Sequence, residues 1–263
     1  MADYVFFRKS RNALSTFLHF VLNLLLGTGS ILITTLSNSW LIGIILVLIS
    51  KWRVFAVQPR YIFLNLKSNL VDFIVGFSFV FLAFYAGKEF AFIHIVLSAL
   101  YSIWLIFIKP LSSEYGTLIQ SLVAIIVGTT ASILMVSSYN PIVLSLSVAL
   151  IGYSASRHVL AQNGDKDLIL MTFICSLIAA EITWFSRFWL ITYNFTLFGS
   201  TFIIPQLSAI LAIVFFMFYK VDSSLTKHDG KISPKEIYPP IIFGVAVIII
   251  LVLFFSRPAF NLY

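Results

Sequence analysis

One acidic residue interrupts the apolar stretch from Leu177 to Trp189. Glu181 is the only acid there, and most residues on both sides are aliphatic or aromatic. An ionised carboxylate inside a membrane is costly, so such a residue usually faces the bundle interior, water or a partner. Glu181 is therefore our first candidate for chemistry, as a group that responds to protons or cations during transport.

Other polar residues are expected at a similar depth in neighbouring apolar stretches. They are Gln206, Thr129, Thr28 and Ser30, and Pro205 would open a backbone carbonyl beside Gln206. One interpretation is a substrate or ion site at a kinked helix, lined by these residues and Glu181. The other is that the small and hydroxylated residues only pack helices together, and Gln206 hydrogen-bonds Glu181.

A second polar cluster is expected at the cytoplasmic side. Asp72 lies near the start of one apolar stretch, and Arg157 and His158 lie near the end of another. An ion pair between Asp72 and Arg157 would neutralise two costly charges. Alternatively, these three residues, with Asp165 and Asp167, form a cytoplasmic site in which His158 carries protons.

Metal and cofactor chemistry have no support in the residue pattern. His19 and His94 have no metal-ligating companion at useful spacing. Cys175 is the only cysteine, which excludes an intrachain disulfide and a thiolate cluster. No motif assigns a catalytic residue, so we expect no metal and no cofactor, and an enzyme is the less favoured class.

Composition defines the elements that must position these residues. Of the 263 residues 60% are hydrophobic and 10% are charged, and the mean hydropathy is +1.02. Soluble domains average about 25% charged residues. A membrane span needs about 20 apolar residues, and by that measure we predict one all-α transmembrane domain, a bundle of about nine helices over residues 1–263. The predicted spans cover 13–36, 40–57, 70–86, 90–108, 116–137, 142–160, 167–192, 196–219 and 237–255.

The distribution of basic residues predicts the orientation, because cytoplasmic loops are enriched in Lys and Arg. With nine spans and a cytoplasmic N-terminus, 14 of the 17 basic residues are cytoplasmic and the C-terminus is external. The three on the outer side are Lys88, Arg187 and Arg257; the others are Arg8, Lys9, Arg11, Lys51, Arg53, Arg60, Lys67, Lys109, Arg157, Lys166, Lys220, Lys227, Lys231 and Lys235. The net charge of +7 therefore indicates contact with anionic lipids and not with nucleic acid.

Two connecting segments could contact partners. Residues 220–236 form the longest predicted cytoplasmic loop, which could dock a protein. Residues 60–68 combine a run of apolar side chains with the basic residues Arg60 and Lys67 and are expected to lie along the membrane surface.

Three functions are compatible with these patterns. The leading hypothesis is a small transport or permeation protein of a bacterial plasma membrane, with its polar site around Glu181. The second is a structural or accessory subunit that binds its complex through the loop at 220–236. The third is a membrane enzyme that acts on a lipid phosphate through the cytoplasmic cluster.

Overall fold

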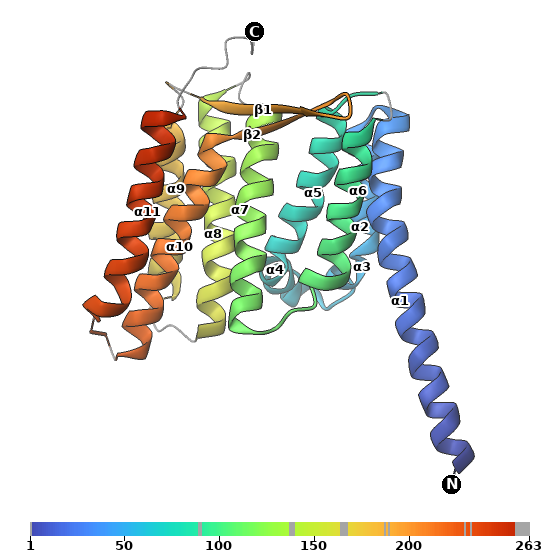
Figure 1. Cartoon of the computed structure of the whole chain (residues 1–263). Coiled ribbons are helices and arrows are strands. Elements are labelled where there is room, and N and C mark those ends of the chain that lie inside the picture. The colour runs from blue at the N-terminus through green and yellow to red at the C-terminus, as the bar shows by residue number, and fades with distance from the viewer. Residues whose placement is uncertain are drawn as a thin grey trace.

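The computed structural model folds the chain into a helical bundle with one β-hairpin (Figure 1). It describes residues 2–88, 91–136, 140–163, 168–186, 188, 190–228, 230–231 and 233–255, and only the backbone of residues 2–14 and 163. The hairpin lies at the top of the view in Figure 1, and the N-terminus and α4 lie towards the bottom. We call these two ends of the bundle the hairpin end and the basic end.

The elements follow one another in the order α1, α2, α3, α4, α5, α6, the π-helical segment η1, α7, α8, α9, β1, β2, α10 and α11. Their bounds are Ala2–Ser37, Trp40–Ser50, Trp52–Phe55, Pro59–Ser68, Leu70–Tyr85, Phe92–Ile103, Trp104–Ile108, Glu114–Val136, Pro141–Asn163, Leu168–Ser186, Thr192–Leu197, Ser200–Pro205, Gln206–Lys227 and Pro234–Phe254.

Six helices of the described chain are long and apolar enough to cross a membrane. They are α1 from Ser15 onward, α7, α8 up to Gln162, α9, α10 and α11. A seventh results if α4 and α5, which meet at a bend of 66°, count as one broken span. The prediction of a helical membrane protein is thus confirmed.

Two of the nine predicted spans form shorter helices than expected. Residues 40–57 break at Lys51 into α2 and α3, and the span predicted at 90–108 contains α6, which begins at Phe92 and continues directly into η1. The 11 residues of α2 extend only about 16 Å at 1.5 Å per residue. That is about half of the hydrocarbon layer, so length alone does not establish α2 as a span.

The largest departure from the prediction is the hairpin. Residues 196–219 were expected to be one helix kinked at Pro205, but residues 192–205 form two antiparallel strands and α10 begins only at Gln206. Pro205 is the residue before the helix, so it causes no kink. The segment is rich in Thr, Tyr, Phe and Ile, which favour strands. Phe198 and Gly199 both have positive φ, as a tight two-residue hairpin turn requires.

Two other predicted boundaries also shift. The seventh span was placed at 167–192, but α9 ends at Ser186. The loop predicted at 220–236 is largely helical, because α10 continues to Lys227 and α11 already begins at Pro234.

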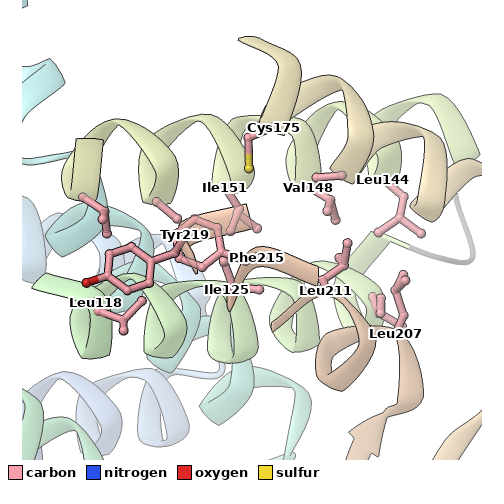
Figure 2. Packing of buried hydrophobic residues seen from close by; sticks show 14 residues of the cluster. Leu118, Ile125, Leu144, Val148, Ile151, Cys175, Leu207, Leu211, Phe215 and Tyr219 are labelled. Carbon is pink, nitrogen blue, oxygen red and sulfur yellow. The ribbon is translucent and has the colours of Figure 1, made fainter. Parts of the chain in front are cut away.

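The bundle contains two hydrophobic cores that meet at α7. One joins α7, α8, α9 and α10, and in Figure 2 Phe215 and Tyr219 of α10 point between Leu118 of α7 and Ile151 of α8. The other joins α1, α5, α6, η1 and α7, and it includes Phe79, Tyr101 and Ala124. Because adjacent residues Ala124 and Ile125 belong to different cores, α7 is the partition between the two halves of the bundle.

Candidate functional site

Several charged and polar side chains of the described chain meet at the basic end, around the side chain of Asp72. This residue lies in the first turn of α5, just after the bend that separates α4 from α5. Its carboxylate oxygen Oδ2 lies 2.8 Å from Nζ of Lys51 and 2.8 Å from Nζ of Lys109. One carboxylate therefore serves two ammonium groups, and the trio carries one excess positive charge.

The π-helical segment η1 explains how one helical segment provides two partners of Asp72, Trp104 and Lys109. In η1 the amide of Lys109 donates to the carbonyl of Trp104, five residues earlier. That spacing places Trp104 and Lys109 close to the same helix face, whereas in an α-helix residues five apart diverge. Accordingly, Trp104 Nε1 donates to Asp72 Oδ1 at 3.3 Å while Lys109 reaches Oδ2.

Gln120 of α7 holds the end of η1 in place. Its amide nitrogen Nε2 donates to the carbonyl oxygens of Ile108, Lys109 and Leu111 at 2.8, 3.1 and 2.8 Å. These acceptors fix the orientation of the amide, so its oxygen Oε1 faces Nε2 of His158 at 2.6 Å. An amide oxygen only accepts, so Nε2 of His158 carries the proton. Nδ1 of a neutral His158 is then an acceptor.

Two adjoining cavities lie beside this network, and we call them the basic cavities. The first, of about 130 Å³, is lined by Ser68, Asn69, Val71, Asp72, Trp104, Lys109, Gln120 and His158. The second, of about 160 Å³, is lined by Lys67, Ser68, Val71, Ser154, Arg157, His158 and Ala161. They share Ser68, Val71 and His158, so the break between α4 and α5 opens onto both.

A larger, mostly apolar cavity lies at the opposite end, and we call it the hairpin cavity. Its volume is about 490 Å³, and residues of α5, α6, α7 and β2 line it. The hairpin is anchored over it by contacts with α6: Ser200 Oγ accepts from the amide of Ile93 at 3.3 Å, and the rings of Phe92 and Phe198 meet edge to face. We call the region where α5, α6–η1 and α7 face one another the seam. The strand β2 covers the hairpin end of this seam.

The structure brings the predicted cytoplasmic residues to these cavities but does not pair them as expected. Asp72 binds Lys51 and Lys109, and Arg157 donates from Nη1 to the carbonyl of Lys67 at 2.8 Å. No contact between Asp72 and Arg157 appears among the described ion pairs. Lysines from the ends of α2 and η1 reach Asp72 because those ends lie next to the first turn of α5. Asp165 and Asp167 lie outside the described residues.

The structure does not bring the residues predicted around Glu181 together. Gln206 is buried and donates to the carbonyl of Leu251 in α11 at 2.7 Å, while Thr129 faces a small void of about 30 Å³ in the core of Figure 2. Thr28 and Ser30 bond carbonyls of their own helix, α1. In Figure 1, α1 lies at the far edge of the bundle from α9 and α11.

Glu181 itself lies on the exposed face of α9, between exposed Ile178 and Trp184. Because α9 ends at Ser186, Glu181 is only about 7.5 Å from the helix end at 1.5 Å per residue. The exposed residues that follow it, Trp184 and Phe185, are aromatic, as is typical of a membrane interface. Arg187, which the orientation prediction places on the outer side, lies outside the described residues.

Several residues of the site were missed by the sequence analysis as site residues. Lys51 and Lys109 were counted only as basic residues at span ends, and the amide of Gln120 was overlooked although it lies inside an apolar stretch. Gln120 carried a usable signal, because a buried amide in a span needs a partner. No sequence signal identifies η1, since its residues Trp104–Ile108 are ordinary apolar helix formers.

The chemistry available at the basic cavities is ionic binding. Among the described residues no group of three His, Cys, Asp or Glu side chains could hold a metal ion. The fold and this site define a helical membrane protein with a cationic pocket at one end of the bundle. No protein-family model matches the chain, and comparison with curated proteins and with solved structures gives no significant match.

Proposed function

We propose that the protein is a transport protein of the plasma membrane that moves its substrate along the seam between α5, the continuous helix α6–η1, and α7. In this proposal the basic cavities receive the substrate from the cytoplasm and the hairpin cavity releases or receives it on the other side. The polar site of the transporter is then the cluster around Asp72, in place of the pocket expected around Glu181.

The observation that supports this proposal is that a cavity lies at each end of the same seam. Asp72, Trp104 and Gln120 line a basic cavity, and residues further along the same three helices line the hairpin cavity. Substrate cavities of helical membrane proteins commonly lie between helices, where side chains from several segments meet. Two cavities in one seam suit a protein that exposes a site to either side in turn.

Packed side chains separate the two cavities. Val75, Phe79, Tyr101 and Ala124 are all buried in the core between them, and the rings of Phe79 and Tyr101 stack at 5.0 Å. The hydroxyl of Tyr101 has no hydrogen-bond partner within the described chain. An unsatisfied buried hydroxyl costs about 1–3 kcal/mol, so a rearrangement of the seam that gave Tyr101 a partner would recover that free energy.

A topology of nine crossings with a cytoplasmic N-terminus is part of the proposal. It is supported by the excess of basic residues on one side, 14 against 3. It is also supported by the direction of the helices in Figure 1, where α1 begins at the basic end and α11 ends at the hairpin end. In this arrangement the short helices α2 and α6–η1 both cross. The half-exposed Lys109 extends the end of η1 towards the headgroups, and Asp72 neutralises the buried Lys51 at the end of α2.

A cysteine accessibility experiment tests whether the seam opens. Cys175 is the only cysteine, so a Cys175→Ser background permits single introduced thiols. Ala124 and Ala155 are matched positions, since both have 0% exposure and each lies in one of the two cores. We expect Ala124→Cys to react slowly with a membrane-impermeant maleimide from both sides of the membrane. Ala155→Cys should react from neither side.

The controls make the result decisive. Both variants should react fully after denaturation in SDS, which shows that each thiol is chemically competent. If Ala124→Cys resists the reagent from both sides, or reacts from one side only, the seam does not expose its centre alternately and the transport proposal is rejected.

A further inference from the structure

We infer that the second basic cavity is a binding site for a phosphate group carried by a membrane amphiphile. This inference deepens the proposed function, because it names the class of substrate that the basic end would admit. Binding of a phosphate group in this cavity does not require the seam to open. The binding experiment and the accessibility experiment can therefore give independent results.

The charges around the cavity favour an anion. Lys67 and Arg157 line it, and no acidic side chain appears among the described residues that line it. Arg157 uses one hydrogen bond to fix its position on the carbonyl of Lys67, while a guanidinium carries five N–H donors. Guanidinium groups bind phosphate oxygens in a bidentate manner, which gives strong and geometrically specific contacts.

A buried hydroxyl provides an independent indication of a ligand. Ser154 lines the same cavity with only 3% of its surface exposed, and its Oγ has no hydrogen-bond partner in the described chain. Several other serines of the described chain donate to a carbonyl of the preceding turn, as Ser156 does to Gly152. The Ser154 hydroxyl is thus a donor without an acceptor beside two cations, and a phosphate oxygen would supply that acceptor.

The position of the cavity points to a lipid headgroup as the source of the phosphate. Lys67 is near the end of α4, a short helix that exposes Tyr61, Phe63 and Leu64. Helices with exposed apolar and basic side chains lie in the headgroup region of a membrane. A cavity at the end of such a helix is therefore at the depth where lipid phosphates are found.

Native mass spectrometry of the purified protein in detergent can measure the binding directly. The probes are phosphatidic acid, phosphatidylcholine and inorganic phosphate, each titrated against the full chain. We expect one phosphatidic acid molecule to remain bound at concentrations where phosphatidylcholine does not. Arg157→Gln should weaken that binding at least about tenfold, the loss of one charge-assisted contact, and Ser154→Ala should weaken it less.

Arg60→Gln is the matched control, because Arg60 is an exposed arginine of α4 that lines neither basic cavity. It removes the same charge and should leave the binding unchanged. If Arg60→Gln and Arg157→Gln weaken phosphatidic acid binding equally, only the general positive charge attracts the lipid. That result would reject a specific binding site in the second basic cavity. Binding of inorganic phosphate with the same dependence on Arg157 would overturn the lipid as its source. Absence of binding by all three probes would overturn the inference entirely.

Discussion

The ammonium group of Lys51 binds Asp72 twice, at the side-chain oxygen Oδ2 at 2.8 Å and at the backbone carbonyl at 2.6 Å. Lys51 lies at the break between α2 and α3 and Asp72 lies in α5, so the contact ties this break to the first turn of α5. The side chain of Lys51 is 5% exposed and that of Asp72 is 13% exposed. The pair is therefore a buried connection between three helices and not a surface ion pair.

This burial predicts unequal roles for the two lysines that bind Asp72. Removing one partner of a buried ion pair costs about 3–5 kcal/mol because the other charge is left without compensation. Exposed pairs contribute about 0–1 kcal/mol, and the Lys109 side chain is 42% exposed.

We expect Lys51→Met to lower the free energy of unfolding by about 3 kcal/mol, since Asp72 keeps Lys109. Lys109→Met should lower it by less than about 1 kcal/mol. Unfolding in SDS titrations measures both, and equal losses would contradict the burial argument.

Glu181 provides a contrasting prediction. Its side chain is exposed on α9 near the helix end, and no hydrogen bond or ion pair of Glu181 is found in the described chain. Replacing it with an isosteric neutral amide removes no contact, and surface substitutions of this kind change stability by about 0.5 kcal/mol or less. Glu181→Gln should therefore unfold at the same SDS fraction as the parent protein. A loss as large as that of Lys51→Met would mean that Glu181 has a partner inside the bundle.

The sequence alone predicted the class of protein and most helices, because long apolar stretches have few other stable structures in a membrane. It failed at residues 192–205, where strand-forming side chains and Gly199 were present but the apolar length suggested a helix. Hydropathy measures only how apolar a stretch is. The preference of Thr, Tyr and Phe for strands was the overlooked signal.

The candidate site was only partly predictable, for a geometric reason. Asp72, Arg157 and His158 could be found because charged residues near span ends are rare and need partners. Their actual partners depend on where each helix stops and turns. The break at Lys51 and the π-helical turn before Lys109 place both ammonium groups at Asp72. Neither feature follows from hydrophobic periodicity.

Close helix packing at Gly152 leads to a further prediction. A Cβ atom added there would lie 2.9 Å from Cβ of Ala179, so α8 and α9 would have to separate. Overpacking of this kind costs about 1–3 kcal/mol. Gly29 in α1 is the matched control, because an added Cβ meets nothing within 4 Å. We expect Gly152→Ala to be destabilised in SDS titrations followed by circular dichroism, and Gly29→Ala to be unchanged or slightly stabilised. Equal behaviour would show that α8 and α9 can separate without cost.

The proposed topology predicts which lysines face the cytoplasm. Lys88 follows α5 at the hairpin end, and Lys227 ends α10 at the basic end (Figure 1); both are exposed. The helices α6, α7, α8, α9 and α10 lie between them, and an odd number of crossings puts the two residues on opposite sides. In the Cys175→Ser background, Lys88→Cys should react with an impermeant maleimide on intact cells. Lys227→Cys should react only after permeabilisation, because the basic end faces the cytoplasm. Reaction of both on intact cells would mean that the short helix α6–η1 does not cross. The reverse pattern would place the N-terminus outside, and the basic cavities would then face the external leaflet.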